Sequence, residues 1–264
     1  MTFLESFEQI AFAAGRVIME VYHSEIAITT KADKTPVTEA DERAEALILK
    51  ELRTRFPDIP VVGEEEVSAG HVPRLSENTF ILVDPLDGTK EFINRRSDFT
   101  VNIALIEKGV PVAGIVFAPA RGVAYVGAGT KAEKLVVSQE GVLIDRQPIK
   151  CRSRGDRLTA VASRSHSTPE TIAFLKKQGI EDHKSVGSSL KFCLVAEGEA
   201  DVYPRFGRTM EWDTAAGDAV LRAAGGVTLK TDGSLFCYGK VDQPDDVAFA
   251  NPHFICWGHF SKPL

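Results

Sequence analysis

The sequence predicts a fold of the α/β or α+β class, with helices and strands in both halves of the chain. In the first half, apolar residues recur every three or four positions over two long segments, and short apolar runs separated by tight turns follow. These patterns are typical of amphipathic helices and of strands in an antiparallel sheet. In the second half, strand-like runs alternate with helical patterns, which indicates a layered α/β arrangement.

The length and composition indicate a globular protein with one large unit or two subdomains. The chain has 264 residues, of which 44% are hydrophobic and 26% are charged, and domains average roughly 150 residues. The sequence pattern changes near residue 150. We therefore expect an N-terminal α+β subdomain over residues 1–150 and a C-terminal α/β subdomain over residues 151–264.

The charge balance argues against a nucleic-acid polymer as a partner. Lys and Arg total 31 against 37 Asp and Glu, a net charge of −6, whereas proteins that bind nucleic acids carry clustered basic residues. A small phosphorylated ligand is compatible, because a bound cation can meet its charge. No run approaches the roughly 18 apolar residues of a membrane span, so we expect no integral membrane segment. The first residues lack the basic start of a signal peptide, and the four widely spaced cysteines favour free thiols in a reducing cytoplasm.

Two helices are expected near the N-terminus. Over residues 3–22 the apolar side chains fall on one helical face, at Leu4, Phe7, Ala11, Ala14, Ile18 and Val21. The second helix begins near Thr38. It ends before Phe56-Pro57, because a proline disfavours helix in the residue that precedes it.

Strands dominate the rest of the first half. We expect them at residues 60–62, 80–83, 101–106, 110–117 and 122–126. Lys108-Gly109 is typical of a hairpin turn, and such short links indicate antiparallel pairing. In the second half we expect a strand at 158–162 and helices that begin at Thr168-Pro169, Ser188 and Asp213, the last ending at Gly225-Gly226.

Carboxylates follow two of the expected strands. Residues 61–63 lead into Glu64-Glu65-Glu66, and residues 80–83 lead into Asp84-Pro85-Leu86-Asp87-Gly88-Thr89. Such acids lie at the edge of a sheet, where α/β folds tend to bind ligands. Oxygen ligands without a nearby His or Cys favour Mg²⁺ over Zn²⁺. Taken alone, Glu64-Glu65-Glu66 is explained as a solvated loop and the segment from Asp84 to Thr89 as a turn. Because acids follow a strand twice in the same half of the chain, we favour a metal site.

Gly88 and Thr89 add a second element to this site. If residues 89–92 form a helical turn, the backbone N–H groups at its start can hold a phosphate. Metal-binding carboxylates beside a phosphate-holding turn suit the hydrolysis of a phosphate ester.

Asp213 and Asp41 have a structural interpretation as well as a functional one. Asp213 stands where an N-cap would begin its helix, and Thr38-Glu39-Ala40-Asp41 resembles a capping box with Asp in the third position. Either carboxylate would also fit a metal shell. Spacing alone favours capping for both.

Motifs over most of the chain resemble the inositol monophosphatase superfamily. They are Gly63-Glu64-Glu65, Asp84-Pro85-Leu86-Asp87-Gly88-Thr89, Trp212-Asp213-Thr214-Ala215-Ala216-Gly217 and Ala224-Gly225-Gly226. The resemblance implies a layered αβαβα sandwich and a lithium-sensitive, Mg²⁺-dependent phosphatase of sugars or nucleotides. Residues 87–92, 187–193 and 203–207 are similar to the 3'(2'),5'-bisphosphate nucleotidases of the CysQ type. Arg208 is a departure, because that group often has proline there.

The resemblance also implies roles for individual residues. Glu64, Asp84 and the Leu86 carbonyl would hold a first Mg²⁺, and Asp84, Asp87 and Asp213 a second, with a third, weaker ion left open. Thr89, its hydroxyl oriented by Asp41, would help to activate a water beside Glu64.

The same resemblance implies how the substrate is held. The Gly88 and Thr89 backbone donors would bind the phosphate. The substrate would also contact Ser188, Lys191 and the metal-site residues Glu64, Leu86, Asp87 and Asp213. The substrate implied is adenosine 3',5'-bisphosphate, cleaved to AMP and phosphate, with 3'-phosphoadenylyl sulfate as a second candidate. Peripheral association with the inner face of a membrane is left open.

Other functions have some support in the sequence. An inositol 1-phosphatase or another small sugar-phosphate phosphatase would use the same metal site, and a non-catalytic cation-binding protein would use the acids alone. An aspartyl-phosphate enzyme is disfavoured, because its acids stand two apart whereas Asp84 and Asp87 stand three apart. Gly127-Ala128-Gly129-Thr130-Lys131-Ala132 fits a loose dinucleotide-binding pattern but lacks a βαβ context, so a loop is favoured.

Overall fold

The computed structural model describes residues 2–30, 36–75, 78–153, 155–163 and 168–259. Its helices are α1 (Phe3–Tyr22), α2 (Glu39–Arg55), α3 (Glu64–Ser68), α4 (Thr89–Ile93), the 3₁₀ helix η1 (Pro119–Arg121), α5 (Pro169–Lys177), α6 (Leu190–Ala196) and α7 (Ala215–Ala223). Its strands are β1 (Ile28–Thr30), β2 (Pro36–Thr38), β3 (Val61–Gly63), β4 (Thr79–Asp87), β5 (Thr100–Glu107), β6 (Val110–Ala118), β7 (Val123–Ala128), β8 (Lys131–Val137), β9 (Leu143–Ile149), β10 (Thr159–Ser163), β11 (Asp182–Val186), β12 (Val202–Arg205), β13 (Val227–Lys230) and β14 (Phe254–Trp257).

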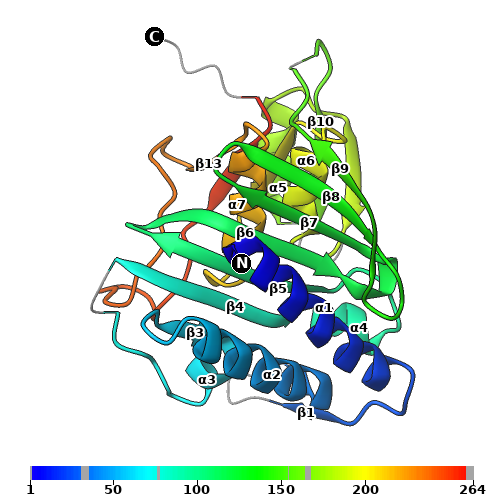
Figure 1. The fold of residues 1–264 in the computed structure, drawn as a ribbon. Coiled ribbons are helices and arrows are strands. Elements are labelled where there is room, and N and C mark those ends of the chain that lie inside the picture. The colour runs from blue at the N-terminus through cyan, green and yellow to red at the C-terminus, as the bar shows by residue number, and fades with distance from the viewer. Residues whose placement is uncertain (1, 31–35, 76–77, 154, 164–167, 260–264) are drawn as a thin grey trace.

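These elements stack in five layers (Figure 1). Helices α1 and α2 cover one face of a seven-stranded sheet, and α6 and α7 lie between that sheet and a five-stranded one. Helix α5 contacts β12 of the five-stranded sheet. The order of layers is therefore α, β, α, β, α, and the expected layered sandwich is confirmed.

The seven-stranded sheet runs in the order β3-β4-β5-β6-β7-β8-β9. Every neighbouring pair is antiparallel except β3 and β4, which are parallel. The expectation of antiparallel pairing throughout this half was therefore wrong for β3. The connection from β3 to β4 contains helix α3, and a connection of this kind can return the chain to the same end of the sheet.

The hairpin at Lys108-Gly109 is confirmed, because β5 and β6 pair on either side of it. The Gly127–Ala132 segment contains the hairpin turn between β7 and β8, where Ala128 pairs with Lys131. It opens no helix.

The five-stranded sheet runs in the order β11-β10-β12-β14-β13. Its β11-β10 and β10-β12 pairs are parallel, and β14 is antiparallel to both of its neighbours. Only β10 was expected from the sequence as a strand of this sheet.

Two large hydrophobic cores and a smaller one, which includes Ala160 and Val202 of the five-stranded sheet, hold the layers together. One lies between the helices α1 and α2 and the large sheet, and includes Phe7, Ile48 and Ile103. The other includes Val62 from the large sheet together with Phe192 from α6. This second core joins side chains from both halves of the sequence, and the division at residue 150 stays a prediction.

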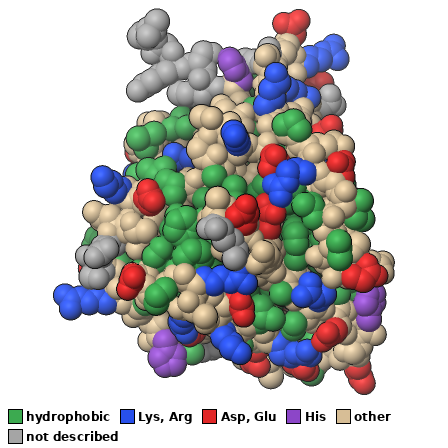
Figure 2. Space-filling view, in the orientation of Figure 1, with side chains coloured by type: hydrophobic (Ala, Val, Ile, Leu, Met, Phe, Trp, Pro, Cys, Tyr) green, Lys and Arg blue, Asp and Glu red, His purple; other side chains and the backbone are tan. Residues whose placement is uncertain are grey.

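None of the helices in the described part of the chain combines the length and the apolar character that a membrane crossing requires. Side chains of both charges are interspersed over the face seen in Figure 2. The four cysteines are free thiols.

Candidate active site

The parallel pairing of β3 and β4 brings two groups of acids to one edge of the sheet. Gly63, the last residue of β3, pairs with Val83 of β4. The residues that directly follow this pair in the sequence are Glu64 and Asp84. Because parallel strands end on the same side, these carboxylates emerge next to each other.

Glu64 is held in place by a buried carboxylate from α2. Glu45 accepts hydrogen bonds from the backbone N–H groups of Glu65 (2.9 Å) and Glu66 (2.8 Å), the first turn of α3. Gly63 precedes this helix and has no side chain to cap it. A Cβ at Gly63 would lie 2.7 Å from the Glu45 carboxylate, so the glycine makes room for a cap supplied by another helix.

The pairing of β4 is irregular where its carboxylates stand. The pairing of β4 with β5 shifts register between Asp84 and Asp87, and Asp84 Oδ1 accepts a hydrogen bond from the Leu86 N–H (3.0 Å). Gly88 then adopts φ +94°, a left-handed conformation that favours glycine, and α4 starts at Thr89. The helical turn expected over residues 89–92 is therefore present.

Asp41 both caps helix α2 and contacts the Thr89 hydroxyl. Its Oδ2 accepts hydrogen bonds from the Thr38 N–H (2.8 Å) and hydroxyl (2.6 Å), which completes the capping box of α2. Its Oδ1 accepts a hydrogen bond from the Thr89 hydroxyl (3.2 Å). The structural and the functional roles are thus divided between two oxygens of one carboxylate.

The capping interpretation of Asp213 was wrong. Helix α7 begins two residues later, with Thr214 as its N-cap residue. The Asp213 Oδ2 instead accepts a hydrogen bond from the Met210 N–H (2.7 Å). This contact fixes the loop before α7 and leaves the carboxylate at the site.

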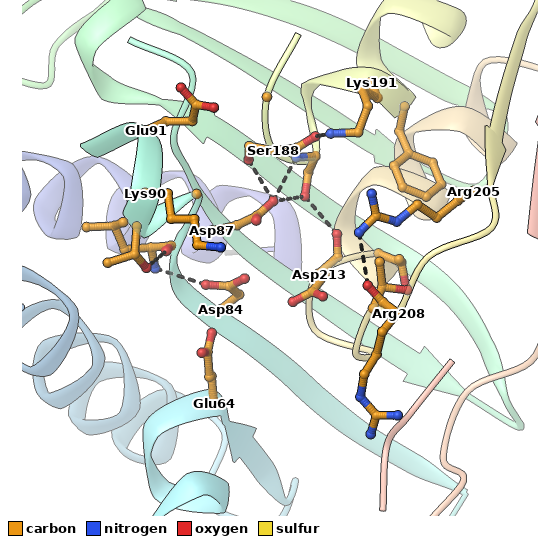
Figure 3. Close-up of a pocket in the computed structure, with 18 of the residues that line it drawn as sticks. Glu64, Asp84, Asp87, Lys90, Glu91, Ser188, Lys191, Arg205, Arg208 and Asp213 are labelled. Carbon is orange, nitrogen blue, oxygen red and sulfur yellow. Dashed lines mark hydrogen bonds between the residues drawn. The ribbon is translucent and has the colours of Figure 1, made fainter. Parts of the chain in front are cut away.

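Three carboxylates from distant parts of the chain converge at one point. Oxygen atoms of Glu64, Asp84 and Asp213 lie within 4.8 Å of one another, and all three residues line a cavity of about 290 Å³ (Figure 3). Burial raises the pKa of Asp84 well above its usual value, and the charges of Glu64, Asp87 and Asp213 raise it further. Burial and the neighbouring Asp87 likewise raise the pKa of Asp213.

This cluster fits a divalent cation that prefers oxygen ligands. Buried like charges repel unless a cation neutralises them. The donors are all oxygen, with neither His nor Cys among the residues that line the described cavity, which is the donor set of Mg²⁺ and similar hard ions. Three of the four predicted acidic ligands therefore come together.

Asp87 lines the same cavity but is held differently. Its Oδ2 accepts hydrogen bonds from the Ser188 hydroxyl (2.7 Å) and from the Ser189 N–H (2.7 Å) and hydroxyl (2.9 Å). All three bonds reach one oxygen, which leaves Oδ1 for a cation. Ser188, an expected substrate contact, thus lies in the wall of the site, with φ +56°.

Basic side chains line the same cavity as the acids. Lys191, Arg205 and Arg208 all line it. Lys191 is buried, and this burial lowers the pKa of its amine to about 8. The buried Arg205 Nε has no hydrogen-bond partner among the described residues, while Arg205 Nη2 donates to the Arg208 carbonyl (2.9 Å).

Some pocket residues were not expected as site residues. Arg205, Arg208 and Lys90 line the cavity, although Arg205 and Lys90 belong to segments that carried the family resemblance and Arg208 is the departure from it. Because arginine and lysine are common on protein surfaces, a single sequence offers no other signal for them.

The fold and this site agree with a known family. A model of the inositol monophosphatase family matches residues 2–253, and the chain belongs to that family. The 3'(2'),5'-bisphosphate nucleotidase CysQ of Salmonella typhimurium strain LT2 is 46% identical over 253 residues, which cover 95% of this chain and 98% of the relative. The protein of the same name from Escherichia coli strain K12 is 45% identical over 248 residues, 93% of this chain and 96% of the relative. The resemblance seen in the sequence motifs is confirmed.

Solved structures give the same result. CysQ from Bacteroides thetaiotaomicron, described as a bacterial member of the inositol monophosphatase family, has a TM-score of 0.79 and 38% identity and covers 96% of each chain. An IMPase from Thermotoga maritima has a TM-score of 0.75 at 22% identity, over 98% of this chain and 92% of that one. At 22% identity, the similarity to the Thermotoga maritima structure supports only the fold.

Proposed function

We propose that the protein is a Mg²⁺-dependent phosphatase that removes the 3'-phosphate of adenosine 3',5'-bisphosphate to give AMP and phosphate. The relatives named 3'(2'),5'-bisphosphate nucleotidase, matched over nearly the whole chain, support the substrate. The single observation that carries the proposal is the convergence of Glu64, Asp84 and Asp213 in a cavity that also holds Lys191 and Arg205.

The acidic side of the cavity would hold two Mg²⁺ ions. Glu64, Asp84 and the Leu86 carbonyl would hold one, and Asp84, Asp87 and Asp213 the other; a third ion is an option. Such ions lower the pKa of water and stabilise the negative charge that develops on a leaving oxygen.

The protein's own groups would orient the attacking water. Because the Thr89 hydroxyl donates to Asp41, its lone pairs are free to accept a hydrogen bond from a water in the cavity. Glu64, at the start of α3, would accept that water's proton. The Gly88 and Thr89 N–H groups would hold the phosphate oxygens, so that the water attacks in line with the bond that breaks.

The basic residues of the cavity would bind the phosphate that is not cleaved. The buried Arg205 Nε has no acceptor among the residues that the structure describes, and a buried donor without an acceptor is costly. A phosphate oxygen would supply that acceptor, and the Lys191 amine would add a second charge-assisted contact beside Ser188. The same contacts would suit 3'-phosphoadenylyl sulfate, our second candidate substrate. They favour a nucleotide with two anionic groups over an inositol monophosphate.

We include in this proposal the cytoplasmic location that the free thiols favour, with peripheral membrane contact as an option.

A substrate comparison tests the proposal. Phosphate release from adenosine 3',5'-bisphosphate, 3'-phosphoadenylyl sulfate and inositol 1-phosphate is measured at matched Mg²⁺, with and without Li⁺, and in EDTA. We expect the bisphosphate to be hydrolysed fastest, inhibition by Li⁺, and no release in EDTA. Faster turnover of the inositol ester would assign the protein to the alternative inositol phosphatase activity. If no phosphate is released from any of the three substrates, the alternative of a non-catalytic cation-binding protein is favoured.

A further inference from the structure

A second cavity of about 980 Å³ lies outside the active site and is lined by basic side chains. It is formed by the end of α1, the segment after α4 and the 3₁₀ helix η1. Four arginines line it, Arg16, Arg95, Arg96 and Arg121, together with His23. None of its lining residues lines the active-site cavity.

Two of these arginines are neutralised by the protein. Arg96 pairs with Glu91 (3.0 Å), and Arg121 pairs with Asp98. Both carboxylates are buried. The charges of these two arginines are therefore largely compensated.

The other two arginines have no counter-charge in the described part of the chain. Arg16 donates a long hydrogen bond to the Glu140 carbonyl (3.4 Å). Arg95 donates to the Ser24 carbonyl (2.6 Å) and lies over the Tyr22 ring, 5.4 Å from its centroid. Both partners are uncharged. Glu20, an acid at the same cavity, pairs with Arg43 instead (2.8 Å).

The cavity therefore carries excess positive charge in a chain whose net charge is −6. Guanidinium groups in one cavity repel each other unless an anion lies between them. Arg95 follows the C-cap residue of α4 with φ +56°, the left-handed conformation that commonly ends a helix.

We propose that this cavity is a second binding site, for a small anion with two or more negative charges, such as a phosphorylated metabolite. Arg16 and Arg95 supply the uncompensated charge and bind the anion through charge-assisted hydrogen bonds, the geometry that guanidinium groups provide for phosphate.

The site shares a wall with the active site. Asp98, the partner of Arg121, accepts a hydrogen bond from the Gly187 N–H (3.1 Å) through its other oxygen. Gly187 immediately precedes Ser188, which bonds to Asp87 in the active site. The two cavities therefore approach each other at Asp98 and the turn that it holds, and also at Glu91, which lines the active-site cavity and pairs with Arg96.

Calorimetric titration of the metal-free protein with inorganic pyrophosphate tests this proposal. The metal is removed with EDTA and the chelator is then dialysed away, because the uncompensated active-site carboxylates disfavour an anion there and EDTA is itself a multivalent anion. We expect one binding site that weakens as salt is added. Arg16→Ala and Arg95→Gln should each weaken binding about tenfold, the loss of one charge-assisted hydrogen bond. Arg74→Ala, an exposed arginine outside the cavity, is the matched control and should bind as the parent does.

A further variant separates the two sites. Arg205→Gln removes a cation of the active-site cavity and should leave the binding of pyrophosphate unchanged. Loss of binding in Arg205→Gln together with full binding in Arg16→Ala and Arg95→Gln would place the anion in the active site and overturn the proposal. Absence of binding to the parent protein would overturn it as well. Hydrolysis by Arg16→Ala and Arg95→Gln, measured without added anion, shows that these variants are folded.

Discussion

The Thr89 hydroxyl lies 3.2 Å from Asp41 Oδ1, although the two residues are 48 positions apart in the sequence. The other oxygen of the same carboxylate caps α2 through Thr38. The start of a helix and one hydrogen bond of an active-site hydroxyl thus depend on the same side chain, while the Leu86 carbonyl is a second acceptor for that hydroxyl (3.3 Å).

We expect Thr89→Ala to lower hydrolysis by roughly 10²-fold or more, the usual contribution of a positioned acid–base group, while Thr89→Ser retains most of it because the hydroxyl remains. Asp41→Asn should lower both activity and stability. Thr38→Ala is the control, because it removes both hydrogen bonds of the Thr38 hydroxyl, at a cost of about 0.5–2 kcal/mol, and leaves the Thr89 hydroxyl and Asp41 Oδ1 in place. Steady-state kinetics and thermal melts separate the two effects. Full activity in Thr89→Ala would contradict the assigned role.

Asp84→Asn and Asp213→Asn should each reduce hydrolysis more than about 100-fold, the upper end of what residues around metal ligands contribute. In EDTA both variants should melt at a higher temperature than the parent, because an uncharged amide removes a buried charge that its neighbours repel. Near-normal turnover of either variant in Mg²⁺ would argue against its role as a ligand.

The metal-free protein should lose stability as the pH rises. Burial raises the pKa of Glu45 from 4.5 to about 7, and it also raises the pKa values of Asp84 and Asp213. At pH values between the unfolded-state and the folded-state pKa of each carboxyl group, the folded state binds more protons than the unfolded state. The free energy of unfolding therefore falls as the pH rises through this range, which for Glu45 runs from 4.5 to about 7.

Melting temperatures in EDTA across this range check that expectation. Glu45→Gln should show a shallower decline, and saturating Mg²⁺ should offset the part that Asp84 and Asp213 contribute. A melting temperature that rises with pH over the same interval would show that the sign is wrong.

Arg205→Gln should distinguish substrates by their second phosphate. We expect kcat/KM for adenosine 3',5'-bisphosphate to fall by about tenfold or more, since a charge-assisted hydrogen bond contributes roughly 1.5–3 kcal/mol. Hydrolysis of adenosine 3'-monophosphate should change much less. An equal loss with both substrates would show that Arg205 acts on the cleaved phosphate or on the fold.

Gly187→Ala should disturb the wall of the site. A Cβ there would lie 2.9 Å from both the Asp98 Cβ and the Asp98 carbonyl oxygen. Overpacking of this kind costs about 1–3 kcal/mol, and the shift would carry Ser188 away from Asp87, so both melting temperature and activity should fall. Gly155→Ala, whose new Cβ would meet only one atom at 3.8 Å, is the control and should change neither.

The sequence predicted the early helices and the acids of the site, because both leave local signals. Apolar spacing predicted α1 over the residues that form it, and the acidic strings after residues 61–63 and 80–83 predicted Glu64 and Asp84. The capping box that contains Asp41 could also be recognised in the sequence, because its partner Thr38 stands only three residues away.

Contacts between distant segments were not predictable in this way. The serines that hold Asp87 lie about 100 positions further along the chain. Asp213 is fixed by the Met210 N–H in a loop whose shape the helix pattern does not show. Strands β13 and β14 are only four residues each, too short for alternation to mark them.

Strand β9 ends the large sheet with residues that discourage further pairing. It forms the outer edge beside β8, and most of its side chains are exposed, among them Asp145, Arg146 and Gln147. Pro148 has no N–H to offer a neighbouring strand, and charged side chains at an edge disfavour stacking of sheets from separate molecules. A seven-stranded sheet that would otherwise present an open template for aggregation is thereby closed to growth on that side.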